Sequence, residues 1–187
     1  FAAVGRTDPG LVRQTNEDAF RLTVRPELEA GAFVVADGMG GCNAGEVASQ
    51  LAVDTVFGVL EPWISGLDEP AGNARWTEET PELLAGAVLT ANRAVYEASK
   101  LDQQQAGMGT TLTLAVMLGE VLTVAHVGDS RALLVHRGRW KQITSDHSVV
   151  AEMIRQGGLS ESEAMVHPQR NVLTRALGTE PDVAVDL

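Results

Sequence analysis

Phe33-Val34-Val35-Ala36-Asp37-Gly38-Met39-Gly40-Gly41 is the stretch from which the organisation of this chain is best read. Its apolar run predicts a buried strand over residues 31–36, so that Asp37 would stand where the chain leaves the core. The glycines that follow permit positive φ angles and let other groups approach the backbone closely.

Two interpretations of Asp37 are open from this stretch alone. A carboxylate at a strand end, with a glycyl carbonyl beside it, suits a hard divalent cation such as Mg²⁺ or Mn²⁺. A strand followed by a tight turn, with Asp37 bonding to backbone N–H groups, is the simpler interpretation because Asp-Gly turns are common. The balance between the two depends on the other acidic motifs of the chain.

Composition argues against several classes of protein. The net charge of -11 disfavours a nucleic-acid binder, which would carry a basic face, and adhesion to anionic membranes. The single cysteine, Cys42, allows neither an internal disulfide nor a cysteine zinc cluster, and we expect a reducing, cytoplasmic location. No stretch of the sequence is apolar enough to span a bilayer, and no signal peptide is visible.

Two amphipathic helices are predicted in the first half of the chain. The first runs from Gly45 to about Leu60 and is ended by Pro62. The second begins at Thr80-Pro81, with Thr80 as a possible N-cap, and residues 65–77 form a loop between the two. Apolar residues recur at spacings of three and four: Val47, Ala48, Leu51, Ala52, Val56, Val59 and Leu60 in the first helix, and Leu84, Ala87, Val88, Ala91, Val95 and Ala98 in the second.

The second half is rich in β-forming residues. We expect strands over Thr110–Leu118, Val121–Val127 and Arg131–His136, with tight turns at Gly119-Glu120 and Arg137-Gly138. Strands joined by two-residue turns are antiparallel hairpins, so the pattern indicates an α+β fold with helices layered on sheets. No internal repeat or linker is visible, and we expect residues 1–187 to form a single domain.

Two further acidic motifs each allow a structural and a functional interpretation. Arg13, Glu17 and Asp18 are the first motif. In the structural interpretation, Arg13 forms a surface ion pair with a neighbouring carboxylate; in the functional one, Arg13 binds phosphate beside carboxylates that attract metal. Gly128-Asp129-Ser130-Arg131 follows an apolar strand, as Asp37 does, and could otherwise be a hairpin corner.

A short helix is predicted over residues 149–156, after Asp146-His147-Ser148. We expect both Asp146 and Ser148 to act in capping this helix, and His147 to be a structural hydrogen-bonding residue and not a metal ligand. The polar segment Leu159–Arg170 that follows is a candidate flap.

Taken in order, these motifs resemble those of the metal-dependent protein phosphatases, the 2C-type serine/threonine phosphatases, in their bacterial form. The resemblance extends from Thr7 to Gly178, and its order and spacing are specific. It rests on Arg13 with Asn16-Glu17-Asp18, on Asp37-Gly38, on Gly107-Met-Gly-Thr-Thr111 and on Gly128-Asp129-Ser130-Arg131. Neither glycine-rich piece is followed by Lys-Ser or Lys-Thr, so a nucleotide-binding loop is not indicated.

The resemblance implies a fold and a metal centre. Family members have two packed antiparallel β-sheets flanked by helices, an α-β-β-α sandwich, with two metal ions at one end. These ions would be Mn²⁺ or Mg²⁺, with a third, weaker site. By motif, Asp37 would bridge the two ions and Gly38 would offer its carbonyl to one of them.

The resemblance also implies roles for other residues. Glu17 and Asp18 would bind metal through water, and Asp129 would help to bind the third ion. Arg13 would hold the substrate phosphate, and Leu159–Arg170 would be a flap beside the active site. The remaining motif residues are expected to be structural: Thr110, Thr111, Ser130 and Arg131.

The implied activity is metal-dependent hydrolysis of phosphoserine and phosphothreonine in proteins by a metal-bound hydroxide. No covalent phosphoenzyme is needed, so Cys42 need not be a nucleophile. Met39 stands where animal members carry a histidine thought to protonate the leaving group, so water or another group must do this. The expected partners are phosphorylated proteins that are substrates of a bacterial serine/threonine kinase, and we expect a monomer.

The family also supplies two metal-binding aspartates from late Asp-Gly-Leu and Asp-Asn motifs, which do not occur in this sequence. Asp182 and Asp186 stand too early and in another context. Because Val183–Leu187 also resembles the beginning of a strand, and the chain starts at Phe1, we expect a chain trimmed at its C-terminus. The alternative function is a catalytically inactive module that binds phosphoproteins or another partner without turnover.

Overall fold

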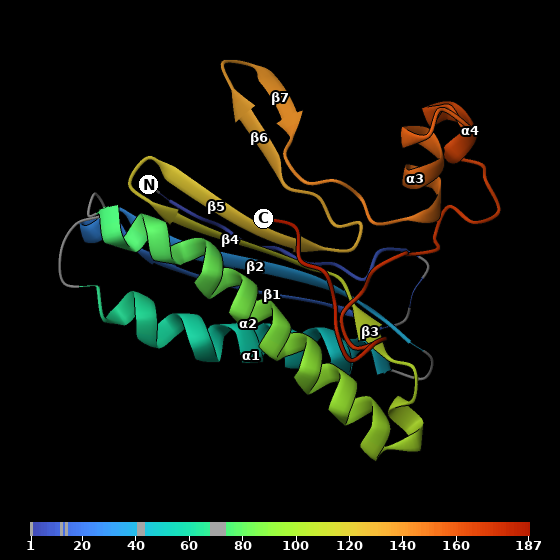
Figure 1. The fold of residues 1–187 in the computed structure, drawn as a ribbon, viewed down its shortest axis with the longest axis horizontal. Helices are drawn as coiled ribbons and strands as arrows, with labels where there is room; N and C mark the ends of the chain where they lie inside the picture. Colours follow the sequence, from blue (N-terminus) through green and yellow to red (C-terminus); the bar gives the residue numbers. More distant parts are fainter. Residues whose placement is uncertain (1, 12, 14, 41–43, 68–73) are drawn as a thin grey trace.

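The fold is described from a computed structural model, which describes residues 2–11, 13, 15–40, 44–67 and 74–187. Cys42 and residues 68–73 of the predicted loop between the first two helices lie outside these residues. The described part has a five-stranded antiparallel sheet with two long helices on one face, and a two-stranded hairpin on the other side of the sheet (Figure 1). The predicted α+β fold with antiparallel sheets flanked by helices is therefore confirmed.

The larger sheet has the strand order β1-β2-β4-β5, with β3 paired to the end of β2. Its strands are β1 (Asp18–Arg25), β2 (Ala30–Met39), β3 (Gly109–Thr110), β4 (Leu112–Leu118) and β5 (Val121–Val127). The smaller sheet is the hairpin of β6 (Leu133–His136) and β7 (Arg139–Gln142). The shorter helices are η1 (Pro26–Leu28), η2 (Gln103–Gln105), α3 (Val149–Arg155) and α4 (Glu161–Ala164). Both predicted two-residue turns are confirmed, at Gly119-Glu120 and at Arg137-Gly138.

β2 is longer than predicted, and Asp37 lies inside the strand instead of beyond its end. The ladder continues because Gly38 and Met39 pair with β3. Alternate residues of β2 point to opposite faces, so Val34 and Ala36 are buried against the helices, each 2% exposed. Val35, 46% exposed, lies on the other face together with Asp37.

Of the two long helices, α1 (Ala44–Ser65) extends beyond both predicted bounds, and α2 (Ala74–Leu101) begins before its predicted start at Thr80. α1 continues through Pro62, and Thr80 is a buried residue inside α2 and not its N-cap. A proline removes one backbone hydrogen bond, but burial of an apolar stripe stabilises the helix on both sides of it. No helix among the described residues is long and apolar enough to cross a membrane.

The buried stripes agree with the predicted ones in α2 and in part of α1. Five predicted residues of α2 are fully buried, namely Leu84, Ala87, Val88, Ala91 and Val95. In α1 the buried residues include Ala48, Ala52, Val56 and Leu60, as predicted, and also Val53, Phe57 and Ile64. Val47 is exposed, because the real stripe is rotated toward Val53 and Phe57, which pack on the sheet.

The start of α1 lies directly against the end of β2 at two glycines. A Cβ atom added to Gly38 would lie 2.0 Å from the carbonyl oxygen of Gly45, and one added to Gly45 would lie 2.9 Å from the carbonyl carbon of Gly38. The Glu17 carbonyl joins this contact, because it accepts hydrogen bonds from Gly38 N at 3.0 Å and from Ser49 Oγ at 2.6 Å. β2, α1 and the segment before β1 are therefore held together at one point.

Gly45→Ala is expected to destabilise the fold by about 1–3 kcal/mol, because the added methyl group would overlap the Gly38 backbone. The matched control is Gly58→Ala in the same helix, where a Cβ would meet nothing within 4 Å. This control should be more stable than the parent by roughly 0.5–1 kcal/mol, through helix propensity. Urea unfolding measures both changes, and equal stabilities of the two variants would contradict the close glycine contact.

Candidate functional site

A cleft of about 390 Å³ lies where the end of β2 meets the loop after β5. It is lined by Arg13, Glu17, Asp37, Gly38, Met39, Gly40, Thr111, Asp129, Asn171 and Leu173. Five of the six residues predicted for the site therefore line one cavity. The sixth, Asp18, lines an adjoining hollow together with Arg13 and Asp37.

The register of the sheet places two of these carboxylates side by side. Asp18 lies directly opposite Asp37 in the β1–β2 ladder, and residues paired in this way carry their side chains on the same face. Burial raises the pKa of Asp37 to about 6, and the negative charge of Asp18 is the next largest cause. The guanidinium of Arg13 lowers this pKa in part, whereas the carboxylate of Asp129 raises it further.

Two threonines hold the Asp37 backbone in place. Asp37 N donates to Thr111 Oγ1 at 2.9 Å, and Asp37 O accepts from Thr111 N at 2.9 Å and from Thr110 Oγ1 at 3.1 Å. Thr111 Oγ1 also lies 2.8 Å from Ser130 Oγ. One hydroxyl group thus links the strand that carries Asp37 to the loop that carries Asp129.

Arg13 forms the ion pair that its spacing suggested. Its Nη1 lies 2.8 Å from Glu17 Oε2, with Glu17 largely buried and Arg13 60% exposed. The remaining N–H groups of Arg13 are accessible to a ligand in the cleft. Asn16 holds the start of β1, because its Oδ1 accepts from Asp18 N at 3.1 Å.

The segment before α3 confirms two predictions and corrects one. Ser148 caps α3 by accepting from Ala151 N, and His147 makes structural hydrogen bonds. The prediction that Asp146 also caps this helix was wrong. Its carboxylate accepts instead from Arg131, with Nη2 to Oδ2 at 2.6 Å, and from Gln142 at 2.8 Å, because a two-pronged ion pair is stronger than a capping bond.

The predicted flap contains the short helix α4. Ser160 and Glu163 form a capping box at its start, so this segment has local structure of its own. Just beyond it, Asn171 and Leu173 line the cleft, and no motif in the sequence indicated either of them. Neither stands in a charged or glycine-rich motif, and only the path of the chain brings them to Asp37.

The carboxylates fit a divalent cation but do not complete a site for one. Within the described ranges, no three Asp, Glu, His or Cys side chains are grouped closely enough to hold a metal ion. Asp18 and Asp37 nevertheless form a pair whose mutual repulsion a cation would relieve, and carboxylate and carbonyl oxygens are the ligands that Mg²⁺ and Mn²⁺ prefer.

Sequence comparison identifies a matching family. The family described as Protein phosphatase 2C matches residues 12–180 of this chain. The serine/threonine phosphatase stp of Listeria monocytogenes is 37% identical over 181 residues, which are 97% of this chain and 68% of that protein.

Solved structures show the same similarity. The crystal structure of the Mycobacterium tuberculosis serine/threonine phosphatase PstP/Ppp has a TM-score of 0.79 at 35% identity, covering 97% of this chain and 69% of that one. The catalytic domain of the serine threonine protein phosphatase PstP in complex with 2 manganese ions has a TM-score of 0.75 at 34% identity, with the same coverage.

Asp37→Asn is expected to stabilise the metal-free protein by roughly 1 kcal/mol at neutral pH, a figure already reduced for solvent screening. The folded state keeps a proton on Asp37 up to about pH 6, whereas the unfolded chain loses it near its ordinary pKa of 3.8. Stability from this proton is therefore full at low pH and is lost as the pH rises through about 6. Asparagine removes the resulting charge.

Thermal unfolding in chelator at about pH 7.5 and about pH 4 measures this effect, which should be larger at the higher pH. Asp54→Asn, an exposed aspartate on α1, serves as the control and should change stability by less than about 0.5 kcal/mol. If the metal-free Asp37→Asn protein were less stable than the parent at pH 7.5, this would contradict the conclusion that the ionised Asp37 carboxylate destabilises the folded state.

Proposed function

Because this chain belongs to the protein phosphatase 2C family, we propose that it hydrolyses phosphoserine and phosphothreonine in proteins with Mn²⁺ or Mg²⁺ as cofactor. The observation that carries the proposal is the Asp18–Asp37 pair in the cleft region that also contains Arg13 and Asp129. The similarity to named phosphatases favours an enzyme over the catalytically inactive module considered from the sequence.

The proposed cation ligands line the cleft and the hollow that adjoins it. Asp37 and the Gly38 carbonyl would hold the two principal ions, with Glu17 and Asp18 acting through water. Asp129 would help to hold a third, weaker ion. When bound, the cations supply an activated water as the nucleophile and positive charge beside the phosphoryl oxygens.

The protein's own groups bind and orient the substrate. Glu17 accepts a hydrogen bond from one N–H group of Arg13 and so fixes the direction of its guanidinium. The other N–H groups can then donate to two oxygens of a phosphate. With a pKa of about 6, the carboxyl of Asp37 is mostly ionised at neutral pH and can act as a ligand. Met39 lines the cleft and has no proton to donate, so the leaving alkoxide would take its proton from water or from another group.

The proposal extends to the setting of the reaction. The substrates would be proteins phosphorylated by a bacterial serine/threonine kinase, and the phosphatase would act as a monomer in the cytoplasm. Residues 1–187 would belong to one catalytic domain.

The chain is expected to hydrolyse a phosphothreonine peptide with Mn²⁺, and to lose turnover in chelator or as Asp37→Asn. Arg13→Ala should lower kcat/KM by about 100-fold, because a charged donor to the transferring phosphoryl group is lost. The matched control is Arg93→Ala on α2. It also breaks an i,i+4 ion pair, Arg93–Glu97 at 3.3 Å, but does not line the cleft.

Three outcomes would count against parts of this proposal. Unchanged turnover in chelator would contradict the metal requirement. Equal losses in the Arg13 and Arg93 variants would contradict the phosphate-binding role of Arg13. A folded chain that binds Mn²⁺ and phosphopeptide without turnover would favour the inactive module.

A further inference from the structure

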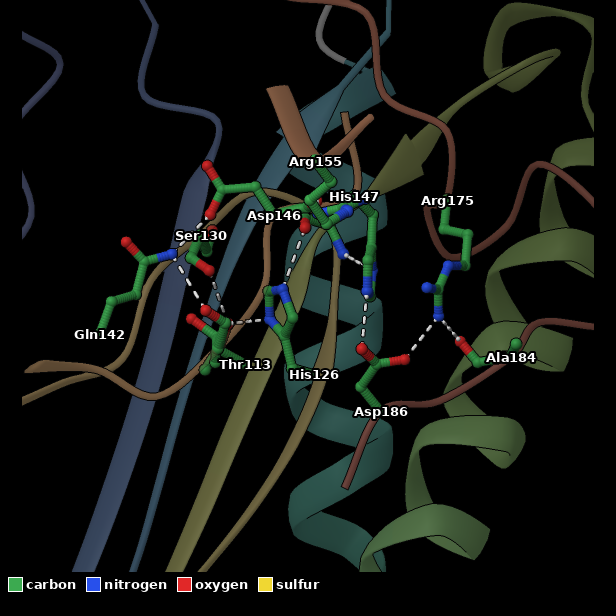
Figure 2. Close-up of polar contacts among 12 residues, drawn as sticks. Thr113, His126, Ser130, Gln142, Asp146, His147, Arg155, Arg175, Ala184 and Asp186 are labelled. Atoms are coloured by element: carbon green, nitrogen blue, oxygen red, sulfur yellow. Dashed lines mark hydrogen bonds and ion pairs between the residues drawn. The ribbon is translucent and has the colours of Figure 1, made fainter. Parts of the chain in front are cut away.

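Two buried histidines contact the backbone of Gly128, the residue that precedes Asp129, and the proposed function uses neither of them. His126, at the end of β5, is 2% exposed, and His147, in the segment before α3, is 1% exposed. Their ring centroids are 4.9 Å apart. Figure 2 shows both rings, with Asp186 and Arg175 continuing the line of contacts beyond His147.

The two histidines bind both polar groups of Gly128. Gly128 N donates to His147 Nδ1 at 3.1 Å. Gly128 O accepts from His126 Nε2 at 3.0 Å and from the backbone N–H of His147 at 2.7 Å. A side chain here is not tolerated, because Gly128 has a φ of 114° and a Cβ would lie 2.6 Å from the Thr111 side chain.

These contacts require one tautomer of each ring. A carbonyl only accepts hydrogen bonds, so His126 Nε2 carries the proton, and a backbone N–H only donates, so His147 Nδ1 carries none. His147 Nε2 then donates to Asp186 Oδ2 at 3.1 Å.

The outer partners of both rings agree with these tautomers. Burial opposes the ionisation of Asp186, but hydrogen bonds from Arg175 and His147 outweigh it and lower its pKa, so this carboxylate accepts. Burial, assisted by His147, lowers the pKa of His126 and favours its neutral form. The Nδ1 atom of His126 therefore accepts from the Thr113 hydroxyl at 2.9 Å.

The loop that carries Asp129 is thereby fixed on both sides. Gly128, before it, is held by the histidines, and Ser130, after it, lies 2.8 Å from the Thr111 hydroxyl. Asp129 itself lines the cleft, and its charge acts on Asp37. A shift of the Gly128 peptide would therefore move the Asp129 carboxylate relative to Asp37.

We propose that His126 and His147 are positioning residues for Asp129: together they hold the Gly128 peptide and so set where the Asp129 carboxylate stands in the cleft. This inference rests on the proposed function, in which Asp129 contributes to cation binding. Neither histidine touches substrate or cation. Each acts through one nitrogen of a neutral ring: Nε2 of His126 donates to the Gly128 carbonyl, and Nδ1 of His147 accepts from the Gly128 N–H.

The test exchanges the same two amides at both positions. The amide group of asparagine lies about where Nδ1 of a histidine ring lies, and the amide group of glutamine lies about where Nε2 lies. Because His126 uses Nε2 toward Gly128 and His147 uses Nδ1, His126→Gln and His147→Asn should keep the contact, whereas His126→Asn and His147→Gln should lose it. The same substitutions at His136, an exposed residue of β6, are the control.

Two measurements on the full chain report the outcome. Amide hydrogen exchange at Gly128 should be slow in the parent and in His147→Asn, and faster in His147→Gln. A titration with Mn²⁺ alone should give parent-like affinity for His126→Gln and His147→Asn, and about 10-fold weaker binding at the weakest site for His126→Asn and His147→Gln. The variants with weaker binding should resemble Asp129→Asn.

Adding Asp129→Asn to His126→Asn or His147→Gln should weaken Mn²⁺ binding no further, because the histidines act through Asp129. Additive losses, or equal losses in all four histidine variants, would overturn the proposal and leave the histidines a purely structural role. A parent chain that binds no Mn²⁺ would instead count against the proposed function. The exchange pattern at Gly128 would still show whether the histidines hold this peptide.

Discussion

The pairing of Asp18 with Asp37 in the β1–β2 ladder is the constraint on which the cleft depends. Burial and the neighbouring charge of Asp18 together raise the pKa of Asp37 to about 6, an arrangement that opposes folding unless a proton or a cation balances it. The opposite face of the same strand offsets this cost, because Val34 and Ala36 pack under the two long helices. One strand thus joins the apolar core to the charged cleft.

A close contact between the backbones of α1 and β2 fixes the cleft relative to the core. The glycines at 38 and 45 let α1 lie against β2, and the Glu17 carbonyl receives a hydrogen bond from each of these elements. Glu17 in turn orients Arg13 through a 2.8 Å ion pair. Asp37 and Gly38, the residues proposed to hold the principal cations, therefore stand on a strand that the core holds in place, and the repulsion at Asp37 is offset by packing on the other face of that strand.

Hydrogen bonds between uncharged groups hold the backbone on which Asp37 and Asp129 stand. Thr111 binds both the Asp37 backbone and Ser130, and the two buried histidines bind Gly128. A buried charged imidazole would be costly, and a ring with its proton on the wrong nitrogen would leave Gly128 unsatisfied. The network therefore holds the acidic loop in one arrangement without adding a further charge next to it.

The sequence by itself determined those features that depend on near neighbours in the chain. The apolar stripe of α2, the two-residue turns and the cap at Ser148 follow from spacing and local hydrogen bonding, and the ordered motifs indicated Arg13, Asp37 and Asp129. Only the tertiary structure decided which residues meet across long separations. The register of Asp18 on Asp37, the pairing of Asp146 with Arg131 and the arrival of Asn171 at the cleft arise from packing between distant segments. The same packing carries α1 through Pro62, because burial of its stripe outweighs one lost backbone hydrogen bond.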